Sequence, residues 1–137
     1  HLLILLFLVL TQIVYGAFVA GLKAGKIYNS WPKMGDEWMP ESVLLDAGAG
    51  AQFIHRILAL VIVAFTLYIW KKANSCSDNP YQITGINCLA LIVLSQTILG
   101  IITLIMGVPI VVALMHQVTA FLLLMSLVFC LFVFKKN

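Results

Sequence analysis

Charged residues are scarce in this chain of 137 residues, since Asp, Glu, Lys and Arg make up 9% of it and apolar residues 63%. Soluble domains carry about 25% charged residues, so this composition is too poor in charge to cover a water-facing surface. The same scarcity excludes a nucleic-acid-binding protein and a disordered segment, although the formal net charge is +3. The composition therefore indicates an integral membrane protein.

Cysteine is also sparse and occurs as Cys76, Cys88 and Cys130. The three residues form no CxxC pair and no even set, so their spacing indicates neither a zinc site nor a disulfide framework. An initiator methionine is absent as well, because the sequence opens at His1 and runs at once into an apolar stretch. We expect the chain to be part of a longer protein.

Long apolar runs are what the sequence has in abundance. A helix needs about 20 mostly apolar residues to cross the hydrocarbon core of a bilayer. Four segments meet this requirement, namely residues 2–22, 51–70, 81–106 and 110–134. None alternates with the period of two that a membrane strand requires. The sequence thus predicts an all-α fold, a transmembrane four-helix bundle that forms one domain over residues 1–137.

The lysines predict the orientation of these helices, because lysine concentrates on the cytoplasmic side of a membrane protein. Lys71 and Lys72 follow the second predicted helix, and Lys135 and Lys136 follow the fourth. The loop over residues 23–50 instead has a net charge of −1, with three lysines and four acidic residues. We therefore expect both termini inside and the loop 23–50 outside.

The outer loop is rich in aromatic residues and prolines, which are Tyr28, Trp31, Pro32, Trp38 and Pro40. Trp and Tyr gather where the bilayer meets water, so we expect a short structure on the membrane surface with its rings at headgroup level. An aromatic belt without any further role would have the same composition. The sequence leaves both interpretations open.

A short motif occurs twice, as Gln12 followed by Gly16 and as Gln96 followed by Gly100. Residues four apart share a helix face, and each of these helices leads into one that carries a single histidine. Two related helical hairpins around a pseudo-twofold axis would produce this pattern. Glutamine and glycine are also common packing residues between membrane helices, and we favour that role for these four residues.

Two histidines, His55 and His116, lie inside predicted spans, where ionisable side chains point to a functional site. They are the fifth and seventh residues of two helices that run from outside to inside. With a rise of about 1.5 Å per residue, both lie within one turn of the same depth in the outer leaflet. Two imidazoles that face each other at one level could bind a haem iron from both sides. Simple hydrogen bonding to neighbouring helices remains the alternative.

Small residues surround both histidines on their helix faces: Ala51 and Ala59 near His55, and Ala113, Thr119 and Ala120 near His116. A flat porphyrin needs such room, although small residues also serve plain helix packing. Zinc or copper would need a third or fourth ligand, and no Cys, Asp or Glu lies at that depth. The sequence thus favours haem over a metal ion held by side chains alone.

Arg56 follows His55 directly and has two candidate partners. Its guanidinium could bind the propionates of an outward-facing haem, or it could reach lipid phosphate. No Asp or Glu lies inside the predicted spans, so no general acid or base is evident there. From the residues alone, we assign no catalytic residue, and the chain is more like an electron-carrying cytochrome than a catalyst.

Residues 16–40, which read GAFVAGLKAGKIYNSWPKMGDEWMP, resemble the loop signature of haem A synthases of the mitochondrial and alphaproteobacterial type. The similarity continues with QFIHR at residues 52–56, QTILG at residues 96–100, and His116 followed by glutamine. The specific part of this signature is the run YNSWP at residues 28–32. The resemblance covers almost the whole chain.

The resemblance implies an eight-helix protein with two similar four-helix halves, which oxidises the C8 methyl of haem O to the formyl of haem A for cytochrome oxidase. It implies that this chain is the C-terminal half, with His55 and His116 as the axial ligands of a haem b. Gln52 then stands where the other half carries a catalytic glutamate. We expect haem O to bind in that missing half, and this half alone to be inactive.

The resemblance also implies partners and a location. The partners would be the N-terminal half, haem O and haem A, membrane lipid, and also haem O synthase and cytochrome oxidase assembly factors, with no nucleic acid among them. The location would be the bacterial inner membrane or the mitochondrial inner membrane. A stand-alone bis-histidine membrane cytochrome is the alternative function, and a packing subunit without a cofactor is a third.

Overall fold

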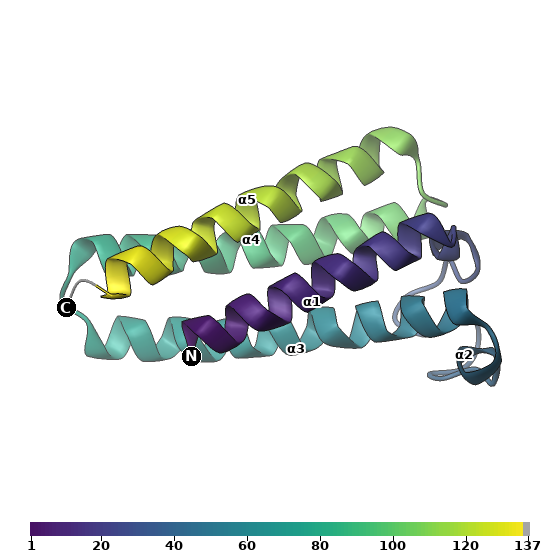
Figure 1. Cartoon of the computed structure of the whole chain (residues 1–137), viewed down its shortest axis with the longest axis horizontal. Coiled ribbons are helices and arrows are strands. Elements are labelled where there is room, and N and C mark those ends of the chain that lie inside the picture. Colours follow the sequence, from purple (N-terminus) through teal and green to yellow (C-terminus); the bar gives the residue numbers. More distant parts are fainter. Residues whose placement is uncertain (136–137) are drawn as a thin grey trace.

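The computed structural model describes residues 1–135 as a bundle of helices (Figure 1). Its four long helices are α1 (Leu2–Gly21), α3 (Ala47–Cys76), α4 (Pro80–Ile105) and α5 (Ile110–Lys135). Two short helices, η1 (Ala24–Lys26) and α2 (Ser42–Leu45), lie in the loop between α1 and α3, which is called the outer loop after the side of the membrane that its charge predicts. Lys136 and the end of the predicted domain 1–137 lie outside the described residues.

The four long helices are each long and apolar enough to cross a membrane. Within residues 1–135 the chain forms no β-strand, apart from an isolated bridge between Met34 and Glu37. The prediction of an all-α transmembrane four-helix bundle is therefore confirmed.

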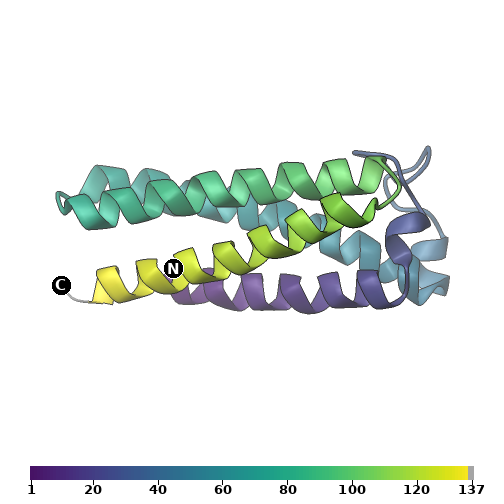
Figure 2. The same ribbon diagram turned by 90° about the horizontal axis from the view of Figure 1, so that it is seen from above.

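The helices are arranged so that α3 and α5 lie diagonally across the bundle. Helix α1 packs against α3 and α5, and α4 packs against the same two helices. Figure 2 shows the long helices alongside one another, with the outer loop and the α4–α5 turn at the same end of the bundle. The two helices that carry His55 and His116 are therefore the diagonal pair.

Helix α3 differs from its predicted range of 51–70, because it begins four residues earlier and ends six residues later. Its amino end is capped by Asp46, whose Oδ1 accepts a 2.7 Å hydrogen bond from the Ala49 backbone N–H. A helix of 30 residues is about 45 Å long, so it extends beyond the hydrocarbon core, which is about 30 Å thick. The outer loop accordingly covers residues 22–46 rather than 23–50.

The α4–α5 connection is a tight turn over residues 106–109. Gly107 and Val108 both have positive φ angles, 73° and 64°. The Val108 backbone N–H donates a 2.8 Å hydrogen bond to the Thr103 carbonyl, which closes the carboxyl end of α4. Helix α5 begins directly after Pro109.

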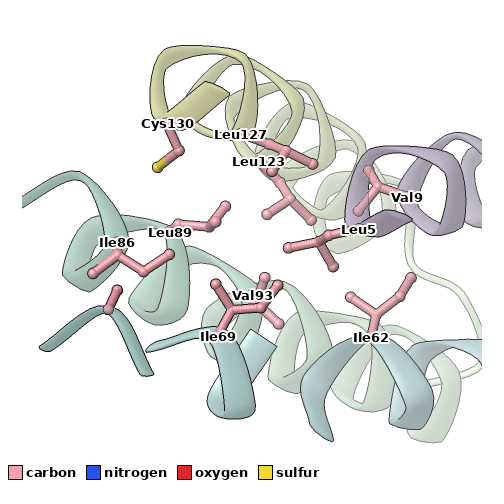
Figure 3. Close-up of a cluster of buried hydrophobic side chains, with 11 residues drawn as sticks. Leu5, Val9, Ile62, Ile69, Ile86, Leu89, Val93, Leu123, Leu127 and Cys130 are labelled. Atoms are coloured by element: carbon pink, nitrogen blue, oxygen red, sulfur yellow. The ribbon is translucent and has the colours of Figure 1, made fainter. Parts of the chain in front are cut away.

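One apolar core joins the four long helices (Figure 3). Its buried members are Leu5, Val9, Ile62, Ile69, Ala73, Ile86, Leu89, Val93, Leu123, Leu127 and Cys130. Helices α1 and α3 form the first hairpin, and α4 and α5 form the second. The core residues nearest the outer loop occupy matching positions in the two hairpins. Val9 and Val93 each precede a glutamine by three residues, and Ile62 and Leu123 each follow a histidine by seven residues. Gln12, His55, Gln96 and His116 thus form a polar layer between this core and the outer loop.

Candidate functional site

The polar layer consists of two glutamine–histidine pairs, one in each hairpin. In the first hairpin, Gln12 Nε2 lies 3.3 Å from His55 Nε2 and also donates a 3.0 Å hydrogen bond to the His55 carbonyl oxygen. In the second, Gln96 Nε2 lies 3.5 Å from His116 Nε2. Each histidine is therefore contacted by a glutamine from the preceding long helix.

The glycines of the repeat contact the same two imidazoles. A Cβ added to Gly16 would lie 3.2 Å from His55 Cε1, and one added to Gly100 would lie 2.9 Å from His116 Cε1. Real Cβ atoms essentially never come within 3.0 Å of such a neighbour, so a side chain at position 100 would displace the His116 ring. At position 16 the contact is tight, and the His55 ring would have to shift by a few tenths of an ångström. The two glycines leave the space that the imidazoles occupy.

The sequence contained the signal for this arrangement, because the Gln-to-Gly motif precedes a histidine helix twice. We expected Gln12, Gly16, Gln96 and Gly100 to serve helix packing, and the structure adds that they do so against the histidines. Which residue each glutamine contacts depends on the register between α1 and α3 and between α4 and α5. The sequence does not determine this register.

Each imidazole keeps one ring nitrogen without a partner. The Nδ1 atoms of His55 and His116 are buried and have no hydrogen-bond partner among residues 1–135. Buried polar atoms in natural proteins are nearly always paired, so such orphaned atoms need an explanation.

The donors in this layer suit a metal held by two ligands. In the described part of the chain, no group of three or more His, Cys, Asp or Glu could hold a metal ion. A haem iron already has four equatorial nitrogens and needs two axial ligands, which two imidazoles on diagonal helices can provide. The residues present therefore fit a haem, whereas a zinc site would need more side chains.

Arg56 contacts the outer loop, a partner that the sequence did not indicate. Its Nη1 donates to the carbonyls of Ser30 at 2.9 Å and Lys33 at 3.2 Å, and its Nη2 donates to Tyr28 at 2.8 Å. The side chain is only 8% exposed, and its guanidinium lies 5.9 Å from the centre of the Trp31 ring. In the structure Arg56 thus binds the backbone of the loop.

Gln52 shares this role. It is 2% exposed, and its Nε2 donates a 3.0 Å hydrogen bond to the same Tyr28 carbonyl that Arg56 binds. Arg56 and Gln52 are one helical turn apart, so they present their donors to one segment of the loop. Sequence reasoning missed this contact because backbone carbonyls leave no mark in a sequence.

The outer loop is also joined to the second hairpin. Asn29 Nδ2 donates to the Gly25 carbonyl at 2.7 Å and to the Leu104 carbonyl, near the end of α4, at 2.9 Å. A Cβ added to Gly25 would lie 2.9 Å from Val108 Cγ2, in the α4–α5 turn. The loop therefore connects both hairpins on the outer side of the histidine layer.

Comparison with known proteins shows what the chain is similar to. It is 41% identical over 133 residues to the heme A synthase of Flavobacterium johnsoniae, covering 89% of this chain and 39% of that protein. It is 39% identical over 143 residues to that of Wolbachia pipientis wMel, covering 98% of this chain and 39% of that protein. For the heme A synthase of Orientia tsutsugamushi strain Boryong the values are 40% over 137 residues, 92% and 37%.

The chain spans about two fifths of the length of these curated relatives. No solved structure matches it at a significant level. The COX15-CtaA family, described as cytochrome oxidase assembly protein, matches residues 1–128. The resemblance noted in the sequence is thus confirmed, and the chain belongs to the COX15-CtaA family.

Proposed function

We propose that this chain is the haem b-binding, C-terminal half of a haem A synthase, with His55 and His116 as the axial ligands of the iron. The observation that carries the proposal is the pair of imidazoles on diagonal helices, each contacted by a glutamine and a glycine of its own hairpin. The names of the relatives support it, as does the share of their length that the chain spans.

In this proposal the chain holds the cofactor and shields it. His55 and His116 would bind the iron, and Gly16 and Gly100 leave room for the two rings. The apolar core closes the inner side of the layer, and the loop bound by Arg56 limits access of water from the outer side. A bound haem b would accept and pass on single electrons.

The groups that transfer protons during the reaction would lie in the N-terminal half of the protein. The four spans of this chain contain no Asp or Glu, and Gln52, whose amide cannot exchange a proton usefully, is bound to the loop. Oxidation of the C8 methyl of haem O would then take place in the other half, and this chain alone would be inactive. Arg56 stays a proposed haem contact through its Nε, because Nη1 and Nη2 bind loop carbonyls and the buried Nε has no partner among residues 1–135.

The proposal extends to location and partners. The complete protein would lie in a bacterial or mitochondrial inner membrane, with both ends of this chain inside and its loop outside. Its partners would be the N-terminal half, haem O, haem A and lipid, and haem O synthase and cytochrome oxidase assembly factors would act with it. Nucleic acid is not among them.

The proposal is tested by the absorption and electron paramagnetic resonance spectra of the chain purified with haem. We expect a low-spin bis-histidine spectrum that His55→Ala and His116→Ala each abolish. His1→Ala is the matched control, because His1 contacts Phe65 and Tyr68 away from the polar layer. An unchanged spectrum in both variants of the layer would refute the assignment.

The scarcity of acids in the spans also favours the second candidate, a stand-alone membrane cytochrome. The two candidates differ in what the complete protein does with haem O. Conversion of haem O to haem A by the complete protein, and none by this chain alone, supports the synthase. Low-spin haem binding without any conversion in the complete protein supports the cytochrome.

A further inference from the structure

The amide of Gln12 meets the imidazole of His55 in a way that fixes where the ring proton lies. We propose that Gln12 is a positioning residue that holds neutral His55 in its Nδ1-protonated form, so that the lone pair of Nε2 is available to a metal. The identity of that metal, a haem iron, rests on the proposed function. The position of the ring proton follows from the contacts of Gln12 alone and does not depend on the proposed function.

The orientation of the Gln12 amide follows from its second contact. Gln12 Nε2 lies 3.0 Å from the carbonyl oxygen of His55, and this oxygen can only accept a hydrogen bond. The nitrogen of the amide, and not its oxygen, must therefore be at this position. A flipped amide would place two acceptors against each other.

The tautomer of His55 follows from this orientation. The amide nitrogen has two hydrogens, one directed to the backbone carbonyl and one available to His55 Nε2, which lies 3.3 Å away. A ring nitrogen that accepts a hydrogen bond must carry a lone pair, so the proton of a neutral ring is on Nδ1. Haem ligation through Nε2 uses this same lone pair, and iron would then replace the amide there.

Nothing else in the described chain competes for the ring. His55 Nδ1 and Gln12 Oε1 are both buried and have no hydrogen-bond partner among residues 1–135. Water is scarce at this depth in a bilayer, so a missing protein partner is not readily replaced. The Gln12 amide is therefore the hydrogen-bond partner that orients the ring.

The second hairpin has a similar glutamine–histidine pair, but its glutamine lacks the additional bond to a backbone carbonyl. Gln96 Nε2 lies 3.5 Å from His116 Nε2, but the structure shows no bond from this amide to a backbone carbonyl. The Gln96 amide can thus turn more freely than that of Gln12. Only the His55 ring therefore faces an amide whose orientation a second contact fixes.

The proposal is tested on the haem-free full chain in lipid nanodiscs, with ¹⁵N-labelled histidine, by nuclear magnetic resonance. The ¹⁵N shifts report which ring nitrogen of His55 carries the proton. We expect Nδ1–H to dominate in the unmodified chain and the Nδ1–H to Nε2–H ratio to fall about threefold in Gln12→Leu, which corresponds to an average interhelical hydrogen bond in a membrane protein.

Thr11→Val is the matched control, because Thr11 precedes Gln12 and its hydroxyl bonds only within α1, to the Phe7 carbonyl. Its ratio should equal that of the unmodified chain. The proposal is overturned if Nε2–H dominates in the unmodified chain, a result that needs no variant to fold. It is also overturned if folded Gln12→Leu keeps the original ratio.

Haem titration of the same samples separates this inference from the proposed function. A chain that shows the expected tautomer and binds no haem contradicts the proposed function and leaves the role of Gln12 standing. A chain that binds haem with a low-spin spectrum, while Gln12→Leu leaves the tautomer of His55 unchanged, contradicts the role of Gln12 alone.

Discussion

Arg56 donates a 2.8 Å hydrogen bond to the backbone carbonyl of Tyr28, 28 residues earlier in the chain. Because Arg56 follows His55 on α3, the outer loop is fastened to the helix one residue away from a proposed iron ligand. The same carbonyl also accepts a hydrogen bond from Gln52, at 3.0 Å. The loop is thus part of the site's framework, and its stability should depend on these two side chains.

Arg56→Lys should loosen the outer loop, because an ammonium group cannot reproduce the planar set of donors that binds three carbonyls. We expect a loss of about 2 kcal/mol in the free energy of unfolding, since buried carbonyls lose charged partners. Trypsin cleavage after the exposed Lys33 should also become faster. Lys26→Gln, which removes an exposed cation of the same loop, should change neither quantity, and equal cleavage rates in both variants would contradict this prediction.

Gly100→Ala should weaken haem binding, because the new methyl group would lie 2.9 Å from His116 Cε1. Gly16→Ala should act in the same way on His55, with a smaller effect because the contact is 3.2 Å. The measurement is the fraction of low-spin haem at a fixed haem concentration. Gly21→Ala is the control, since its Cβ would meet nothing within 4 Å, and an equal loss in all three variants would point to helix stability instead.

Asn29→Ala should uncouple the outer loop from the second hairpin. The variant loses the 2.9 Å hydrogen bond to the Leu104 carbonyl and the 2.7 Å bond to Gly25, each worth about 1 kcal/mol. Hydrogen exchange in the α4–α5 turn and in the loop should therefore rise together. Ser30→Ala loses bonds to Lys33 and Gly35 within the loop, so it should raise exchange in the loop and leave the turn unchanged.

Leu127→Ala should destabilise the bundle, because Leu127 is 0% exposed in the apolar core. A cavity left by a buried leucine costs about 2–5 kcal/mol. Leu114→Ala on the same helix removes a side chain that is 59% exposed, so its effect should stay within about 0.5 kcal/mol. Reversible unfolding in denaturing detergent measures both, and similar losses would show that α5 is packed differently.

The number and nature of the helices could be predicted because hydrophobic length is a local property of a sequence. Each of the four spans is recognisable from its own residues, and the structure places a long helix over each. The ends of α3 were missed, since they depend on the Asp46 cap and on polar residues that continue the helix beyond the hydrocarbon core. A prediction based on the length of an apolar run detects neither the cap nor the polar extension.

By itself the sequence determined a membrane bundle with two histidines at a similar depth, and it exposed the repeat of glutamine and glycine. The tertiary structure decided that these glutamines and glycines contact the histidines, and that Arg56 donates to backbone carbonyls of the loop. The physical reason is that spacing along a helix defines which face a residue lies on. The residue that this face meets depends on the register between helices, which the packing of the whole bundle sets.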